Sequence, residues 1–342
     1  MLAGQSASAS QAATGPVARV AVAGATGYTG QELVRILARH PAVKLTIATS
    51  SGANTRRLPA LAHVWDGVVT PLDPDVLIRE ADVVFLAVPD SAAAELAPRL
   101  LAGGARVIDL SGAFRLRDEA LRRRWYPETH DVPEGTVYGL TELERSHLRA
   151  ARLVTNPGCY PTAAVLALAP LVKANLLEAG SDVIVDAKSG VSGAGKTPSE
   201  RTHFSEVHGS LSAYGVFNHR HGAEIEQGVG RTVTFTPHLL PLAQGELVTS
   251  YVTPTRDVDA DEIAELFDDL YAAEPFIELR RGPVGVIDVR DTNYARLSWH
   301  HDPRTNRVIV FAAIDNLWKG AASQAVQNLN LMFGRPETEG LR

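Results

Sequence analysis

Three side chains in the middle of the chain have types and positions suited to acyl transfer. Cys159, the one cysteine among 342 residues, stands between the strand-like segment 152–158 and an apolar segment with Pro161 in its first turn. Proline at that place is typical of a helix start. A thiol at a helix N-terminus meets unpaired amides and the positive end of the helix dipole, and both favour the reactive thiolate. We therefore predict that Cys159 is a nucleophile rather than a small buried hydrophobe.

A thiol nucleophile needs a base, and the stretch NHRHGAEIEQ offers His219 and His221, two residues apart. If the segment from Arg220 onward is helical, His219 precedes its start and His221 lies in its first turn. A base must hold one angle toward the sulfur, which favours the residue on the regular element. We expect His221 to be the base, with Glu224 on the same helical face orienting its ring. We expect His219 and Glu224 to contact the substrate. No metal is expected here, because no third ligand stands at a suitable spacing.

A glycine-rich turn, GATGYTG, lies between the strand-like segment 17–24 and the helical segment 31–40. Its glycines follow GxxGxxG rather than GxGxxG, which alone is a weak signal. Between a strand and a helix, however, such a turn brings backbone amides to a pyrophosphate and lets the helix pack closely. The residues of this turn that we expect to bind a dinucleotide are Gly24, Thr26, Gly27, Tyr28, Thr29 and Gly30.

The choice between NAD and NADP depends on the residues about twenty positions further along. NAD enzymes place a carboxylate there for the ribose 2′-hydroxyl. This chain has Ser50, Ser51 and Arg56 instead, with no acidic residue among them. Hydroxyl and guanidinium groups suit a 2′-phosphate, whereas a carboxylate would repel it. The sequence therefore predicts NADP as the cofactor.

The stretch GVSGAGKT at 190–197 satisfies the phosphate-loop pattern of nucleoside triphosphatases. A true phosphate loop leads into a helix whose N-terminus binds the phosphates. Here Thr197 is followed by Pro198 and by a segment without an apolar helical stripe, so we reject the triphosphatase interpretation and regard the Lys-Thr ending as coincidence. Small residues still allow a backbone to approach a ligand closely. Ser192 and Gly193 are therefore candidates for lining a site.

The elements that must position these residues differ between the two halves of the chain. Strand-like segments at 17–24, 43–50, 81–89 and 105–111 alternate with helical ones and lack period-2 patterning, which indicates a parallel sheet covered on both faces. Later strand-like segments alternate in part, as an antiparallel or mixed sheet would. We predict an α/β fold, with a Rossmann-type doubly wound parallel sheet and an α+β catalytic domain.

The expected organisation follows from that division. It comprises a disordered leader at 1–16, an NADP-binding domain at 17–157 that the C-terminal segment 318–342 rejoins, and a catalytic domain at 158–317. Arg115 comes just past the strand-like segment 105–111, where an open α/β sheet binds its ligands. Its guanidinium suits a phosphate or carboxylate, so we expect Arg115 to bind substrate.

Composition limits the classes of partner. The net charge is −6, from 33 basic and 39 acidic residues without a block of like charges, which argues against nucleic acid or an anionic membrane. No apolar run reaches membrane-spanning length, and the first residues lack the basic start and apolar core of a signal peptide. A single cysteine fits a reducing compartment, so a cytoplasmic enzyme is expected.

Taken together, these motifs resemble the N-acetyl-gamma-glutamyl-phosphate reductase family of arginine biosynthesis. The blocks that carry the resemblance are GATGYTGQEL, DLSGAFRL, VYGLTEL, NPGCYPTAA, DAKSGVSGAGK, HRHGAEIEQ, TFTPHLLP and DNLWKGAASQAVQNLNLMFG, which span nearly everything from residue 17 to residue 341. The resemblance implies that Cys159 forms a thioester and that the two histidines supply the base. It also implies that Ser192, Gly193 and Asn316 contact NADP near the nicotinamide.

The residues after the cysteine separate this family from its relatives. Aspartate-semialdehyde dehydrogenases usually continue with Asn-x-Thr, whereas this chain has Tyr160, Pro161 and Thr162, and we expect Tyr160 to help bind substrate. The implied substrate is a small acyl phosphate, and the implied assembly is a homo-oligomer, either a dimer or a tetramer. Three positions depart from the usual pattern, namely Ala113 in SGAFRL, Gly222-Ala223 after the histidines and Gln244 before Gly245.

Two alternatives remain open at this stage. One is an aminoadipyl- or aspartyl-phosphate reductase with the same chemistry, and the other is a redox sensor that binds NADP without catalysis.

Overall fold

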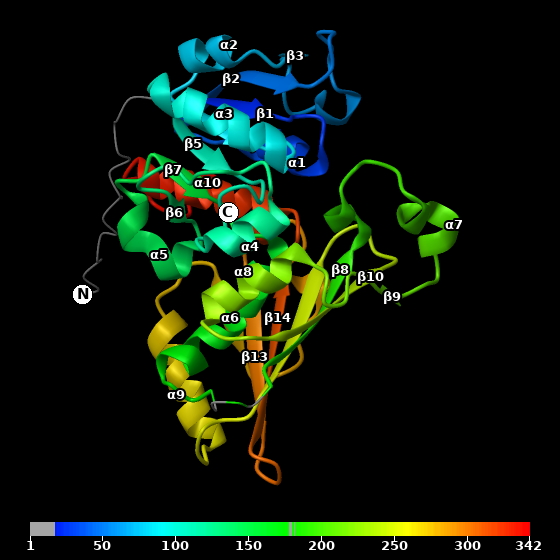
Figure 1. Ribbon diagram of the computed structural model, residues 1–342, viewed down its shortest axis with the longest axis vertical. Coiled ribbons are helices and arrows are strands. Elements are labelled where there is room, and N and C mark those ends of the chain that lie inside the picture. Colours follow the sequence, from blue (N-terminus) through cyan, green and yellow to red (C-terminus); the bar gives the residue numbers. More distant parts are fainter. Residues whose placement is uncertain (1–17, 178–179, 181) are drawn as a thin grey trace, which may run out of the picture.

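Residues 18–177, 180 and 182–342 are described by the computed structural model, in which two seven-stranded sheets form the upper and lower parts of the molecule (Figure 1). The leader expected at 1–16 lies outside the described residues. Every strand pair of the first sheet is parallel, and its order is β3-β2-β1-β4-β5-β7-β6. Its strands are β1 (Ala18–Ala23), β2 (Val43–Ser50), β3 (Val69–Pro71), β4 (Val83–Leu86), β5 (Arg106–Asp109), β6 (Val137–Tyr138) and β7 (Leu153–Thr155).

Helices cover both faces of this sheet, so the predicted parallel, doubly wound arrangement is confirmed. The strands lack period-2 patterning because both of their faces are buried, as in all four residues of β4. The helices of this half are α1 (Tyr28–Leu37), α2 (Pro74–Glu80), α3 (Asp90–Ala102), α4 (Glu119–Trp125) and α5 (Thr141–Leu148), with the short 3₁₀ turn η1 (Pro59–Leu61).

The second sheet is mixed, as predicted. Its order is β12-β13-β14-β11-β8-β10-β9, with parallel pairs β8–β10 and β12–β13 and antiparallel pairs elsewhere. Its strands are β8 (Ile184–Gly190), β9 (Ser212–Ala213), β10 (Thr234–Leu240), β11 (Glu246–Val252), β12 (Ile277–Arg280), β13 (Ala295–Asp302) and β14 (Arg307–Ile314).

One face of the second sheet packs against helices that bury its main core. Helix α6 (Cys159–Lys173) is buried from Tyr160 to Leu171 and contacts β11, β14, α8 (Arg220–Val229) and α9 (Ala260–Tyr271). The remaining short elements are α7 (Phe204–Val207), η2 (Val191–Ala194), η3 (Glu200–Thr202) and η4 (Val286–Asp288). Because α6 is apolar on all sides, it is buried between the second sheet and its other helices. This packing fixes the position of its first residue, Cys159.

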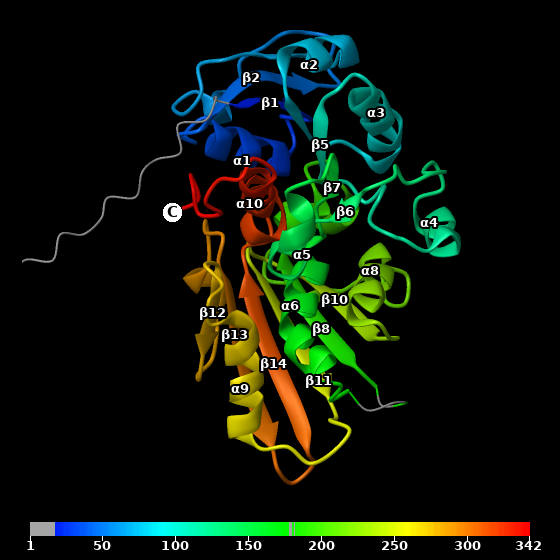
Figure 2. The ribbon, with the colours of Figure 1, turned by 90° about the vertical axis from the view of Figure 1, so that its left-hand side faces the viewer.

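After β14 the chain returns to the first half through the π-helix η5 (Trp318–Ala322) and α10 (Ser323–Met332). Helix α10 packs on α1 and α5 and shares their hydrophobic core, so the predicted helical return is confirmed (Figure 2). Lys319 anchors the crossing, because its Nζ lies 2.6 Å from Oε1 of Glu142 and both side chains are fully buried. The domain boundaries drawn from the sequence stay a prediction. No helix within the described residues is both long and apolar enough to cross a membrane.

Candidate active site

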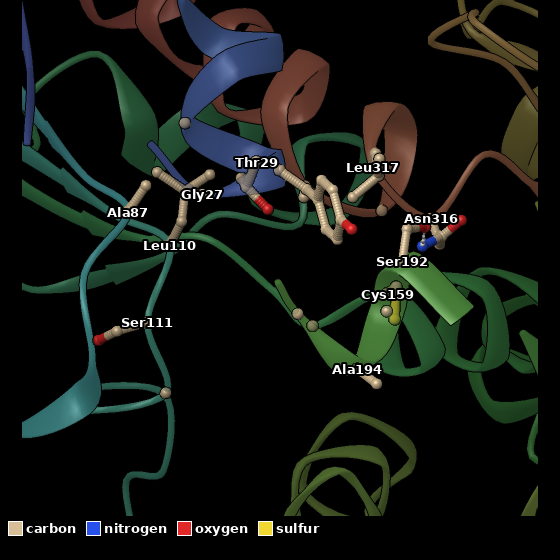
Figure 3. A pocket seen from close by; sticks show the side chains of 18 of the residues that line it. Gly27, Thr29, Ala87, Leu110, Ser111, Cys159, Ser192, Ala194, Asn316 and Leu317 are labelled. Atoms are coloured by element: carbon tan, nitrogen blue, oxygen red, sulfur yellow. Dashed lines mark hydrogen bonds between the residues drawn. The ribbon is translucent and has the colours of Figure 1, made fainter. Parts of the chain in front are cut away.

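A cavity of about 550 Å³ lies where the two halves meet (Figure 3). Its lining comes from segments that are far apart in the sequence. These are the start of α1, the loops that follow β4 and β5, the start of α6, the loop after β8, the start of α8, and the segment between β14 and α10. The first three follow or adjoin the carboxyl ends of parallel strands, which is where open α/β sheets bind ligands.

The glycine-rich turn before α1 is shaped for close backbone approach. Gly24 has φ +93°, and a Cβ added to it would lie 2.1 Å from the carbonyl oxygen of Ala87. A Cβ on Gly30 would lie 2.2 Å from the carbonyl oxygen of Gly24, so only glycine permits this contact. Helix α1 begins after Gly27, and no described side chain caps it. Its first amides are therefore left for an anionic ligand, which fits the pyrophosphate of a dinucleotide.

Cys159 is the first residue of α6, and its side chain lines the cavity. Gly320 packs so closely that an added Cβ would lie 2.7 Å from Cβ of Cys159. The helix N-terminus favours the thiolate through the Tyr160 amide, as expected, but other effects outweigh it. Burial raises the pKa of Cys159 well above its ordinary value, the carboxyl of Glu246 adds to this, and the Tyr160 amide opposes it less strongly.

The two histidines occupy different positions at the start of α8. His219 is the N-cap, and its Nδ1 accepts a hydrogen bond from the backbone N–H of His221 at 3.1 Å. His221 lines the cavity, and a Cβ added to Gly158 would lie 2.5 Å from its Nε2. That ring edge therefore lies against the residue before the thiol. Burial lowers the pKa of His221 well below its usual value and lowers the pKa of His219 to about 4, so both rings are neutral at pH 7.

Glu224 makes contacts other than the expected one with His221. Its carboxylate accepts hydrogen bonds from the backbone N–H of Gly158 at 2.9 Å and from the hydroxyl of Tyr138 at 2.8 Å, and it pairs with Arg115 at 3.3 Å. Within the described part of the chain, Nδ1 of His221 has no hydrogen-bond partner. The expectation that Glu224 orients the imidazole is therefore wrong, because the carboxylate is committed to a buried cation and to the N-cap of α6.

Arg115 brings a fixed positive charge to the cavity. Its guanidinium donates from Nε to the carbonyl oxygen of Asn156 at 2.8 Å and from Nη2 to that of Leu110 at 2.9 Å. The side chain is almost fully buried yet reaches the cavity, and its Nη1 would lie 3.0 Å from a Cβ on Gly158. Because three protein contacts hold the group, its charge beside Cys159 needs no reorganisation when an anion binds.

The loop after β8 is confirmed not to be a triphosphatase loop. Strand β8 leads into the 3₁₀ turn η2, and the next α-helix, α7, starts only at Phe204 and has four residues. Ser192 and Cys159 both line the cavity (Figure 3), and the Ser192 hydroxyl accepts a hydrogen bond from Nδ2 of Asn316 at 2.9 Å. Lys196 and Thr197, whose match to the phosphate-loop pattern was regarded as coincidence, also line the cavity. Lys196 also donates to the carbonyl oxygen of Thr26 at 3.2 Å.

Comparison with known proteins supports one assignment. Residues 19–151 match the family model described as semialdehyde dehydrogenase, NAD binding domain, and residues 159–316 match semialdehyde dehydrogenase, dimerisation domain. The N-acetyl-gamma-glutamyl-phosphate reductase of Desulforudis audaxviator is 46% identical over 94% of this chain and 97% of its own length. The enzyme of the same name from Symbiobacterium thermophilum is 47% identical over the same shares. The chain belongs to the N-acetyl-gamma-glutamyl-phosphate reductase family.

Solved structures agree on the fold of this reductase. Aspartate semialdehyde dehydrogenase II of Vibrio cholerae, complexed with ASA, matches with a TM-score of 0.71 and 18% identity over 94% of this chain and 99% of that chain. Aspartate semialdehyde dehydrogenase with NADP from Candida albicans gives a TM-score of 0.67 and 15% identity, over 93% and 98% of the two chains. At such identities the likeness establishes the fold alone. The reductase family and the fold together make this chain an oxidoreductase with a nicotinamide cofactor.

The structure of this reductase-family chain gathers about half of the predicted site residues around one cavity. Those that line it are Gly27, Tyr28, Thr29, Gly30, Arg115, Cys159, Ser192, Gly193, His221 and Asn316. Those outside the lining are Gly24, Thr26, Ser50, Ser51, Arg56, Tyr160, His219 and Glu224. The ligand contacts assigned to both groups stay predictions.

Tyr160 illustrates how a residue next to the nucleophile can lie away from the cavity. It is 1% exposed, its hydroxyl donates to the carbonyl oxygen of His238 at 3.1 Å, and its ring packs edge-on against His219 and His221. Tyr160 therefore packs against the two imidazoles without lining the cavity itself. Ser50 is also buried, whereas Ser51 and Arg56 are exposed near the end of β2, with Arg56 held by a backbone bridge to Val69.

Two departures from the reductase pattern have structural explanations. Gln244 donates from Nε2 to Asp291 and to Asp315, each at 2.7 Å, and so supports the segment that carries Asn316 rather than the cavity itself. Ala113 is fully buried in the core that the first sheet forms with α2 and α3.

Sequence reasoning also missed Glu246, a fully buried carboxyl beside the thiol. Its signal was an acidic residue at the start of an otherwise uncharged strand, ELVTSYV.

Proposed function

We propose that this chain catalyses the NADP-dependent reduction of N-acetyl-L-glutamyl 5-phosphate to N-acetyl-L-glutamate 5-semialdehyde, with release of phosphate. The observation that carries the proposal is the placement of Cys159 and His221 in the same cavity as the glycine turn of α1. A nucleophile and a dinucleotide site that share a cavity suit chemistry in which an acyl group is first transferred to sulfur and then reduced. The names of the reductase relatives point to the same substrate.

In the first step, Sγ of Cys159 attacks the acyl carbon and the bond to phosphate breaks. The S–H bond breaks as the C–S bond forms, and its proton passes to Nε2 of His221 and then to a departing phosphate oxygen. A neutral imidazole is needed for this, and the lowered pKa of His221 keeps it neutral. Arg115, fixed beside Cys159, stabilises the negative charge that develops there. The product of the step is an acyl thioester on Cys159.

In the second step the thioester is reduced and the thiol is restored. The amides at the start of α1, together with Ser192, Gly193 and Asn316 of the same cavity, would hold NADPH, which would supply the hydride. Before this step His221 takes up one proton from solvent, and it gives that proton to the oxygen of the reduced carbon after hydride addition. As the C–S bond breaks, the O–H proton returns to His221 and passes from there to the sulfur, which releases the aldehyde and restores the thiol. Glu224 is assigned a positioning role instead of the substrate contact expected from the sequence, because it is fully buried and outside the cavity lining.

The preference for NADP over NAD is part of the proposal. It rests on Ser50, Ser51 and Arg56 at the end of β2, which is next to β1 and the glycine turn. A cytoplasmic location, expected from the single cysteine, remains a prediction.

We also propose a homo-oligomer whose subunits meet through the open face of the second sheet. Helices α6, α8 and α9 occupy the other face, and the open face carries half-buried polar side chains such as Lys188 and Asp186, paired at 2.5 Å, and His238. The family model for this half is a dimerisation domain, which supports a dimer as the basic unit. Light scattering coupled to size exclusion would measure the mass, and a monomer at micromolar concentration would contradict this part of the proposal.

One assay tests the reaction and separates it from the alternatives. Purified protein is incubated with NADP, phosphate and each of three semialdehydes, those of N-acetyl-glutamate, aminoadipate and aspartate, while NADPH formation is followed. We expect phosphate-dependent turnover with the N-acetyl-glutamate compound. Turnover with only one of the others would move the substrate assignment within the superfamily. Binding of NADP without turnover on any of them would favour the redox-sensor alternative.

A further inference from the structure

Glu246 is a buried carboxyl that the proposed reaction does not yet use. It is the first residue of β11, it has no exposed surface, and it is outside the cavity lining. Strand β11 is fixed on both sides, where Glu246 pairs in register with Ser189 of β8 and Ile314 of β14. Helix α6 packs on the same strand. The carboxyl is therefore held rigidly. Asp315 follows Ile314, the β14 partner of Glu246, and a Cβ added to Gly320 would lie 3.3 Å from the carbonyl oxygen of Asp315 and 2.7 Å from Cβ of Cys159, so this end of β11 lies at the start of α6. Cys159 and Ser189 are accordingly the side chains that act on the carboxyl.

Other buried glutamates of the chain have a cation as partner. Glu142 pairs with Lys319 at 2.6 Å, and Glu224 pairs with Arg115 at 3.3 Å. Glu246 has no such cation among the described residues, and neither of its oxygens makes a hydrogen bond with ordinary geometry there. An ionised carboxylate in that setting is costly, because a buried charge is tolerated only when it is paired or well hydrogen-bonded.

The neighbourhood of Glu246 adds negative rather than positive charge. Besides each other, Glu246 and Cys159 have four ionisable neighbours with which they influence pKa values, namely Tyr160, Tyr214, Asp315 and Arg115. Arg115 is the one cation in this set, and it acts on Cys159 rather than on Glu246. Two adjacent buried acids cannot both ionise, as carboxyl pairs in enzymes show. Burial raises the pKa of Glu246 to about 8, with Asp315 adding to the shift.

We propose that Glu246 and Cys159 share one proton when the nucleophile is active, so that Glu246 is an uncharged carboxylic acid that donates its O–H to the thiolate sulfur. The pair then carries a single negative charge. In the acyl-transfer step the thiol proton goes to Nε2 of His221, and Glu246 keeps its own proton directed at Sγ. When sulfur leaves the reduced carbon, the same O–H stabilises the thiolate until His221 returns the proton. No oxidant or further reactant enters this exchange.

This inference rests on the proposed role of Cys159, and its test needs no acyl substrate. The rate of alkylation of Cys159 by iodoacetamide is measured from pH 6 to pH 10 in the wild type, Glu246→Gln, Glu246→Leu and Ser250→Ala. Ser250 is a matched control, since it lies on the same strand, is fully buried, and has a hydroxyl without a partner among the described residues. Because alkylation does not depend on which acyl phosphate is used, failure of the substrate assignment would leave this result unaffected.

The two substitutions at Glu246 separate a hydrogen-bond donor from a charge. Glutamine offers an N–H to sulfur but cannot titrate, so Glu246→Gln should show one simple rise with pH. In the wild type the carboxyl loses its proton above about pH 8, and the carboxylate then opposes formation of the thiolate, so the alkylation rate should rise less steeply with pH in that range. Leucine offers no donor, so alkylation of Glu246→Leu at pH 7.5 should be about tenfold slower than that of Glu246→Gln. Ser250→Ala should follow the wild type.

Infrared difference spectra provide an independent measurement. At pH 7 the wild type minus Glu246→Gln spectrum should contain the carbonyl band of a protonated carboxyl, and alkylation of Cys159 should shift that band. Superimposable alkylation profiles for wild type and Glu246→Leu would overturn the proposal. So would the absence of a protonated-carboxyl band, or alkylation of both variants much faster than the wild type, since each would mean that Glu246 is an ionised group that only repels the thiolate.

Discussion

The backbone N–H of Gly158 donates a hydrogen bond to Oε1 of Glu224 at 2.9 Å, so that helix α8 holds the N-cap of the helix that begins with Cys159. The same carboxylate pairs with Arg115, whose other two donors bond to backbone carbonyls near the ends of β5 and β7. One buried ion pair therefore connects the loop after β5, the nucleophile helix and the histidine helix. Removing either charge of this pair should lower both the stability of the fold and the rate of catalysis.

Glu224→Gln should lower the free energy of unfolding by about 3–5 kcal/mol, because it leaves Arg115 as an unpaired buried cation. The double variant Arg115→Met/Glu224→Gln should regain part of that stability, since it removes the stranded charge. It should nevertheless remain inactive without the cation at the cavity. Urea denaturation and kcat/KM measure the two effects, and a single Glu224→Gln variant as stable as the wild type would contradict the role given to the pair.

Gly158→Ala should reduce kcat about 100-fold or more, because its Cβ would overlap Nε2 of His221 at 2.5 Å and displace the imidazole from the sulfur. Gly158 has φ −68°, which alanine adopts without strain, so the fold should persist. Gly222→Ala is the matched control, since an added Cβ there meets its nearest described neighbour, Phe235, only at 3.8 Å. Equal activity of the two variants would show that His221 does not need its present position.

His219 should prove to be a helix cap whose side chain can be replaced by another capping residue. Its Nδ1 accepts from the amide of His221, and asparagine can accept the same bond. We expect His219→Asn to unfold like the wild type at pH 7 and His219→Ala to lose about 1 kcal/mol. If both variants retain full stability but raise KM for the acyl substrate, then substrate binding, as inferred from the sequence, is the main role of His219.

The same residue predicts a dependence of stability on pH. Its pKa is lowered to about 4 in the folded protein, so between about pH 6.5 and pH 4 the unfolded chain binds a proton that the folded chain does not. Stability should therefore fall as the pH falls through this window, and His219→Asn should show a shallower fall. Thermal unfolding at a series of pH values measures the two slopes. Parallel slopes would mean that other groups, such as His221, account for the acid sensitivity.

For the cofactor, Arg56→Ala should raise KM for NADP about tenfold and leave KM for NAD nearly unchanged, because a charge-assisted contact to a 2′-phosphate exists only with NADP. Arg56 is exposed at the bridge to Val69, so the substitution should not disturb the core. Arg281→Ala, at an exposed position after β12 in the other half, is the control. An equal change in KM for both cofactors would show that the 2′-phosphate binds elsewhere.

The fold was largely predictable because the apolar pattern of the strands differs between the two halves. Uniformly apolar strands indicate a sheet buried on both faces, and partly alternating strands indicate a sheet buried on one face. Strand β2 was expected at 43–50 and spans Val43–Ser50. The condition set for the histidine roles, a helix from Arg220 onward, is met by α8. The presence of Cys159, His221 and Ser192 in one cavity was expected from the motif types. The element boundaries depend on short-range periodicity and on turn chemistry, which a sequence records directly. The shared site was instead implied by the chemistry of a thiol and its base and by the family resemblance.

The electrostatic partners of the site residues were harder to predict, because they depend on which distant helices and strands pack against one another. Glu224 was paired with His221 by its spacing along one helix, yet it bonds to residues more than sixty positions away. The thiolate preference of Cys159 was inferred from the helix end alone, whereas burial and Glu246, brought close by the second sheet, raise its pKa. The apolar segment after Cys159 does signal burial, but the approach of Glu246 leaves no local trace in the sequence around the cysteine.

The return of the C-terminal segment limits how this chain can be divided. Helix α10 supplies part of the core beneath α1, and the buried pair Lys319–Glu142 fastens the crossing that also carries Asn316. The cofactor-binding half is therefore not a modular cassette. A chimera that exchanges residues 18–157 with those of a relative would also need that relative's residues 317–342. Otherwise the core side chains of α1 and α10 would come from two different proteins and would not be matched to each other.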